Sequence, residues 1–117
     1  MLMLGTEYTD TITLGSGLVI TEQLICVAST SAGFGSVESV DGILVLGPVV
    51  LTQGTLLNEP TTTIPTVTQN LYNQRIIAQE VFSISFEPTS QSPLVTSGEL
   101  TFGGTDFTQY TDSIAYT

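Results

Sequence analysis

The sequence predicts one mostly β domain over residues 1–117 with a single short helix, and three observations support this fold class. Twenty of the residues are threonine, a β-branched type that suits a pleated strand. Charged residues make up only 10% of the chain, so the helix formers Lys, Glu and Arg are scarce. Several segments alternate apolar and polar residues with the period of two that a half-buried strand requires.

The first two strands are expected to form a β-hairpin. Residues 5–14 alternate apolar side chains with threonines, and residues 18–28 form a second run of apolar and β-branched residues. Gly15-Ser16-Gly17 lies between them and suits a short turn. The chain is therefore expected to reverse direction at residues 15–17.

The next part of the chain combines a loop with core candidates. Residues 29–39 are rich in Ser and Gly and predict a surface loop. Residues 40–48 are almost continuously apolar and close with Gly-Pro, which predicts a fully buried strand that ends in a turn. Cys26 lies in an apolar run and is the only cysteine, so we expect a buried, free thiol.

The second half contains the predicted helix, near residues 65–74. Pro65 suits a first helical turn after the threonines at 61–63, and four apolar residues are spaced along one face: Ile64, Val67, Leu71 and Tyr72. Three further strands are expected at residues 81–86, 99–102 and 113–117, with a Pro/Ser loop at 87–97 and a turn at 103–106.

Composition excludes several classes of function. The chain has no histidine, so neither a Ser-His-Asp nucleophile system nor a His-bearing zinc site can form. The net charge is −10 and Arg75 is the only basic side chain, so nucleic acid and anionic membranes are not expected partners. No apolar run approaches the ~20 residues that span a bilayer. We expect no metal and no cofactor, because neither a calcium loop nor a phosphate-binding glycine motif is present.

The order of short segments along the chain resembles the middle of the N-terminal lobe of pepsin-like aspartic peptidases, the fungal secreted members above all. The matching segments cover essentially everything beyond Leu4; in chain order they are residues 5–15, 27–29, 40–47, 64–71, 82–88, 98–106 and 110–117. Two positions depart from the family pattern, Val45 and Asp112, where glycine is usual. The resemblance implies a partial acid-protease β-barrel and an extracellular location, although residues 1–5 do not have the character of a secretory signal.

The resemblance also implies a reaction for which this chain lacks the catalytic groups. The family hydrolyses peptides with two aspartates from Asp-Thr/Ser-Gly motifs, which share a proton and activate a water. Neither motif occurs among the 117 residues, because Asp10, Asp41 and Asp112 all lack glycine two positions later. We therefore expect no catalytic residue in this chain. The family consists of aspartic endopeptidases, but we expect no peptidase activity from this chain alone.

Substrate contact is a separate question. In the family, the residues beside Asp-Gly-Ile line a hydrophobic subsite, and the resemblance transfers this role to Val40 and Ile43. The alternative for both residues is plain packing in the core.

Three functions follow from these expectations. The first is a truncated, non-catalytic binding or interaction protein on the peptidase fold, with a peptide or protein partner. The second is a fragment or subunit of an active aspartic endopeptidase. The third is a small extracellular lectin-like or cell-stimulating β-protein. A lobe that lacks partner strands leaves sheet edges unpaired, so we also expect a homo-oligomer formed through exposed edges.

Overall fold

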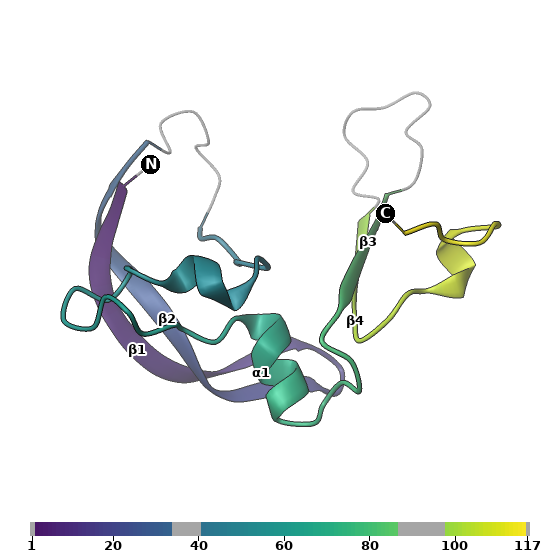
Figure 1. Cartoon of the computed structure of the whole chain (residues 1–117), viewed down its shortest axis with the longest axis horizontal. Coiled ribbons are helices and arrows are strands. Elements are labelled where there is room, and N and C mark those ends of the chain that lie inside the picture. Colours follow the sequence, from purple (N-terminus) through teal and green to yellow (C-terminus); the bar gives the residue numbers. More distant parts are fainter. Residues whose placement is uncertain (1, 34–40, 87–97, 117) are drawn as a thin grey trace.

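The computed structural model describes residues 2–33, 41–86 and 98–116 and consists of two hairpins joined through a short helix (Figure 1). The long, curved hairpin pairs β1 (Leu2–Gly15) with β2 (Leu18–Ala32). The short hairpin pairs β3 (Phe82–Phe86) with β4 (Gly98–Phe102). Helix α1 (Val67–Asn73) lies between the hairpins, and two 3-10 turns, η1 (Val49–Thr52) and η2 (Phe107–Gln109), complete the elements.

The N-terminal hairpin confirms the sequence prediction. Strands β1 and β2 are antiparallel and their last pair is Gly15 with Leu18, so Ser16 and Gly17 form the turn. Gly17 has a φ of 75°, a conformation that glycine adopts without steric penalty. Strand β2 continues to Ala32, so residues 30–32 pair with β1 instead of belonging to the expected loop at 29–39, and Ser29 lies at an irregularity of the register.

Helix α1 has clear start and stop signals. Thr66 precedes the helix in extended conformation, and its hydroxyl accepts a hydrogen bond from the backbone N–H of Gln69 (3.4 Å). At the other end, Arg75 N–H donates to the Tyr72 carbonyl (3.0 Å) and Ile76 N–H donates to the Leu71 carbonyl (2.9 Å). These two bonds form a Schellman motif, in which the residue at the position of Arg75 must be left-handed.

The core is small and lies where α1 meets β2. Four apolar residues are buried among those described, namely Ile20 of β2, Val67 and Leu71 of α1, and Ile77. Ile20 and Leu71 are completely inaccessible to solvent. The expected apolar face of the helix is therefore confirmed for Val67 and Leu71, whereas Tyr72 is exposed.

A set of amide side chains joins α1 to β2 beside this core. Gln23 is buried, and its Oε1 accepts from Asn70 Nδ2 (2.9 Å) while its Nε2 donates to the Pro65 carbonyl (3.2 Å). Gln74 Oε1 accepts from the Thr21 backbone N–H (3.0 Å), and Gln74 Nε2 donates to the Thr21 carbonyl (2.8 Å). Gln74 thus pairs with the edge of β2 as a neighbouring strand would, at the irregularity between Asp10 and Ile12 of the β1–β2 register.

The C-terminal hairpin also confirms the predicted strands at 81–86 and 99–102. Its register pairs Phe82 with Phe102 and Ile84 with Leu100. The loop expected at 87–97 lies outside the described residues. Gly103 follows β4 with a φ of 85°, and a Cβ at this position would lie 2.9 Å from Ile77 Cβ, so the hairpin approaches the core through a residue without a side chain.

Three local expectations are wrong. Residues 41–46 have no regular structure and residues 41–45 are exposed, because no described strand pairs with them and buries them. Residues 113–116 likewise form no strand. Cys26 is exposed, because the β1–β2 sheet is a bare two-stranded ribbon at this point and no described layer covers it. Within the described residues, no helix is long and apolar enough to cross a membrane.

The turn η2 is organised by Asp106. Its Oδ1 accepts from the backbone N–H of Thr108 (2.8 Å) and from the Thr108 hydroxyl (2.7 Å). These two hydrogen bonds, with a smaller contribution from the side chain of Glu99, hold the pKa of Asp106 below its usual value.

Arg75→Gly is expected to stabilise the protein by about 0.5–1 kcal/mol. Arg75 has a φ of 60°, which is unfavourable for any residue with a Cβ and is where glycine ends a helix best. Chemical denaturation measures the change. Arg75→Ala is the matched control, because it removes the same charge but keeps the Cβ at positive φ; equal gains in both variants would contradict the backbone explanation.

Asp106 is expected to titrate below 3.8, the usual value for this side chain. Because its pKa is lower in the folded than in the unfolded chain, its contribution to stability is present above the unfolded pKa and is lost as the pH falls through the folded pKa. The Thr108 amide, followed by NMR during acid titration, reports the midpoint.

The matched pair for this titration is Asp106→Asn and Asp112→Asn, which remove the same charge six positions apart. Asp106→Asn should flatten the acid limb of the stability curve. A midpoint at or above the usual aspartate value would contradict the assignment.

Candidate functional site

Of the two predicted subsite residues, the structure describes Ile43, which does not pack in the core. Ile43 is 50% exposed, in the irregular segment that follows Asp41. Val40 lies outside the described residues, so its predicted role stays a prediction. Core packing, the alternative for Ile43, does not hold, and this side chain is free to contact another molecule.

Ile43 belongs to an exposed apolar stretch, which we call the 43–51 stretch. Its exposed large side chains are Ile43, Leu44, Val45, Val50 and Leu51. Thr52 anchors the end of the stretch, since its hydroxyl donates to the Val49 carbonyl (2.7 Å) and accepts from the backbone N–H of Ile64 (2.7 Å). The exposed apolar side chains therefore lie on a segment that Thr52 ties by hydrogen bonds to Ile64, a residue that precedes α1.

The described carboxylates do not form a peptidase dyad. Glu99 and Asp106 are close enough to interact, but neither is buried and neither belongs to an Asp-Thr/Ser-Gly motif. A dyad needs one carboxyl group that stays protonated beside its ionised partner, in a site that excludes bulk water. Asp10 and Asp41 are exposed. Among the described residues, no group of three or more possible ligands could hold a metal ion.

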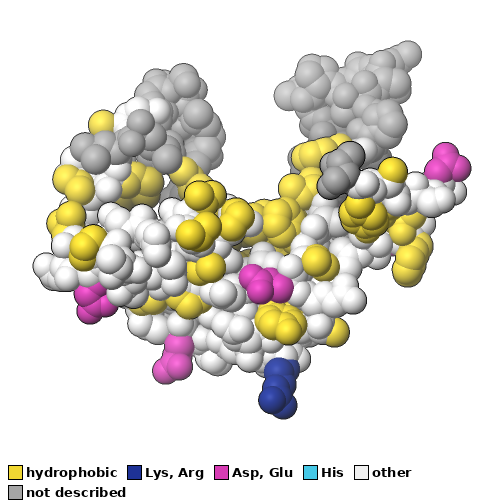
Figure 2. All heavy atoms as spheres, in the orientation of Figure 1, with side chains coloured by type: hydrophobic (Ala, Val, Ile, Leu, Met, Phe, Trp, Pro, Cys, Tyr) yellow, Lys and Arg dark blue, Asp and Glu magenta, His cyan; other side chains and the backbone are white. Residues whose placement is uncertain are grey.

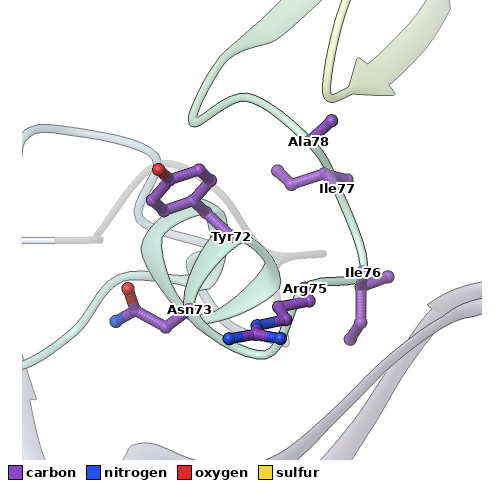
Figure 3. A pocket seen from close by; sticks show the side chains of 6 residues that line it. All are labelled: Tyr72, Asn73, Arg75, Ile76, Ile77 and Ala78. Carbon is purple, nitrogen blue, oxygen red and sulfur yellow. The ribbon is translucent and has the colours of Figure 1, made fainter.

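A hollow of about 520 Å³ lies at the C-terminal end of α1 (Figure 3). It is lined by Tyr72, Asn73, Arg75, Ile76, Ile77 and Ala78. Figure 3 shows Tyr72 and Arg75 projecting from different sides of the helix end, so the phenol and the guanidinium do not converge on one point. The hollow has a cation, an amide and a phenol but no carboxylate, so it contains no acid-base pair for hydrolysis.

Many hydrophobic side chains lie on the visible surface. Figure 2 shows them on both arms and between the arms, while the acidic side chains are scattered singly, one of them beside hydrophobic side chains in the middle of the view. Sequence reasoning missed this exposure, because it assigned residues 40–48 to a buried strand. The signal available in the sequence was the excess of apolar residues over what two hairpins of two strands each can enclose.

Comparisons with known proteins agree with this fold. A family model for eukaryotic aspartyl proteases matches residues 2–117. The chain is 57% identical to polyporopepsin of Irpex lacteus over 113 residues, which are 97% of this chain and 32% of polyporopepsin. It is 33% identical to cathepsin D of Dictyostelium discoideum over 115 residues, 97% of this chain and 27% of that protein.

The crystal structure of the aspartic proteinase from Irpex lacteus matches with a TM-score of 0.85 at 55% identity. The match covers 95% of this chain and 31% of that one, so the chain spans about a third of the length of the relatives. The predicted pepsin-like fold, as part of an N-terminal lobe, is thereby confirmed. The chain belongs to the eukaryotic aspartyl protease family.

Proposed function

We propose that this chain serves peptide hydrolysis as a substrate-contacting, non-catalytic part of a pepsin-like aspartic endopeptidase. The observation that carries the proposal is the combination of 57% identity to polyporopepsin with the lack of any Asp-Thr/Ser-Gly motif in the 117 residues. The catalytic aspartates would then come from outside these residues, in the same polypeptide or in another chain. We place the working enzyme outside the cell, as the likeness to secreted fungal peptidases implies.

The 43–51 stretch supports substrate contact. Ile43 is exposed on a stretch that Thr52 holds in place, and peptide substrates bind in apolar subsites through side chains of this kind. Val40 and Ile43 are the residues that we assign to this subsite. The exposed Asp41 is not assigned a catalytic role, because it does not belong to an Asp-Thr/Ser-Gly motif.

The second candidate is a binding protein on the same fold that never acts in catalysis. The missing motifs favour it, since a single chain without the dyad cannot both activate a water and protonate the leaving amine. The two candidates differ in one respect. Only the first requires that this chain support hydrolysis once the two aspartates are supplied.

A chimera of polyporopepsin decides between them. Residues 2–117 replace the matching third of that enzyme, which leaves its remaining length intact. We expect the isolated chain to show no pepstatin-sensitive cleavage of a hydrophobic peptide at about pH 3–5, and the chimera to cleave it. A folded chimera that binds pepstatin but does not cleave would contradict the peptidase proposal.

Ile43→Ser in this chimera tests the subsite. Loss of one apolar contact lowers kcat/KM by about 10- to 200-fold for a substrate that fills the pocket. Leu57→Ser is the matched control, because Leu57 is 88% exposed and lies outside the 43–51 stretch. The subsite assignment fails if the two variants have equal kcat/KM values.

A further inference from the structure

We propose that Thr61 is a site of O-linked glycosylation, at which a neutral hexose is attached through the threonine hydroxyl. The inference rests on the extracellular location proposed above, since the sugar is expected to be attached during export. It concerns a part of the chain that the peptidase proposal does not use. The threonine cluster, the turn that carries it and its charge environment support the assignment in turn.

The acceptor segment is a cluster of threonines between two prolines. Residues 60–65 read Pro-Thr-Thr-Thr-Ile-Pro. Segments that combine Ser or Thr with Pro are typical acceptors of O-linked sugars. Proline lacks a backbone N–H and fixes φ, so it keeps such a segment out of regular structure. The structure agrees, because residues 62–66 lead into α1 without belonging to a strand or a helix.

A hydrogen-bonded turn places Thr61 at a corner of the surface. The Thr62 backbone N–H donates to the Glu59 carbonyl (3.0 Å), with Pro60 and Thr61 between them. Proline is favoured at the second position of such a turn because its fixed φ suits that position. Thr61 is exposed in the described part of the chain. A sugar on Thr61 therefore projects from a backbone that is already fixed.

The same turn closes a loop. The Pro60 carbonyl accepts a hydrogen bond from the Gly54 backbone N–H (2.9 Å). The Thr61 carbonyl accepts one from Gln53 Nε2 (3.4 Å). These bonds engage the backbone of the turn and not the Thr61 hydroxyl. The closed loop carries Leu57, which is 88% exposed, so a glycan on Thr61 adds hydration at the base of a loop with an apolar tip.

Thr61 is favoured over its two neighbours in the cluster. The Thr62 hydroxyl donates to Glu59 Oε2 (3.1 Å), and a glycan on Thr62 would remove this hydrogen bond. Thr63 is half-buried, so a bulky group has less room there. Attachment at Thr61 costs neither a hydrogen bond of this kind nor burial.

Electrostatics favours a neutral sugar over a phosphate at the same hydroxyl. The chain has a net charge of −10, and a phosphate would add about 1.5–2 further negative charges. At Thr61 these charges would lie in the same turn as the Glu59 carboxylate, in a chain whose only basic side chain is Arg75. Like charges at this spacing repel each other. A hexose adds bulk and hydroxyl groups without adding charge.

The attachment is a displacement at the sugar. Thr61 Oγ1 attacks C1 of a hexose that is carried on the phosphate of a lipid or a nucleotide. The C1–Oγ1 bond forms while the bond between C1 and the phosphate oxygen breaks. The phosphate carrier leaves with the electron pair, and the hydroxyl proton passes to a base of the transferase. Nothing is oxidised or reduced.

Peptide mapping by mass spectrometry tests the proposal. The samples are the 117-residue chain and the chimera with polyporopepsin, each secreted from a eukaryotic host. We expect the peptide that contains Thr61 to carry one or more hexose masses in both. Thr61→Val should lose them, because valine keeps the β-branched shape without the hydroxyl, and Thr61→Ser should retain them. The chimera shows whether Thr61 stays accessible when the rest of a peptidase is present.

Thr55→Val is the matched control, because Thr55 is also an exposed threonine of the closed loop but does not lie between prolines. It should leave the hexose on the Thr61 peptide unchanged. The proposal is overturned by an unmodified Thr61 peptide in the secreted chimera, by a phosphate mass in place of a hexose, or by equal loss in both valine variants. Peptidase activity is scored separately. A glycosylated chimera that does not cleave contradicts the proposed function alone, and an active chimera without hexose contradicts this inference alone.

Discussion

The structure depends on the joint between α1 and β2. Ile20 and Leu71 are the two side chains that solvent does not reach at all, and they belong to these two elements. Gln23, Asn70 and Gln74 surround the contact with amide hydrogen bonds, whereas the buried hydroxyl of Thr68 in α1 has no hydrogen-bond partner among the described residues. Ile77 and Gly103 then attach the second hairpin to the same core. Each hairpin alone is a two-stranded ribbon, which is marginally stable in water, and the joint supplies the packing against other apolar residues that both need.

Local signals predicted most of the elements. The alternation of apolar residues with threonines predicted the N-terminal hairpin, and Gly15-Ser16-Gly17 predicted its turn. The spacing of the apolar residues Val67 and Leu71 predicted the helix correctly. Both side chains pack against strand β2, which its own sequence pattern also predicted. The resemblance to a known family predicted the overall fold. Several short segments in the family order identify a fold even when each segment alone is weak evidence for it.

Burial was the part that local pattern did not predict. Residues 40–48 have the composition of a central strand, yet a strand is central only if neighbours pair with it, and neighbours are a tertiary property. Cys26 illustrates the same point, since its apolar flanks predicted a core position and the described sheet has no layer over it. The exposure of Ile43 has the same cause. Val67 and Leu71 are in the core as their spacing predicted, whereas Ile43 and Cys26 lie on the surface.

The central claim is that one small joint holds the fold while the rest of the apolar surface stays uncovered. Hydrogen exchange on dilute protein tests it most directly, because protection reports the free energy of opening at each amide. The account predicts the slowest exchange at Thr21, Asn70 and Gln74, whose N–H groups are bonded within the joint, and faster exchange throughout β3 and β4. Slowest exchange in β3 and β4, with rapid exchange at Thr21 and Asn70, would contradict it.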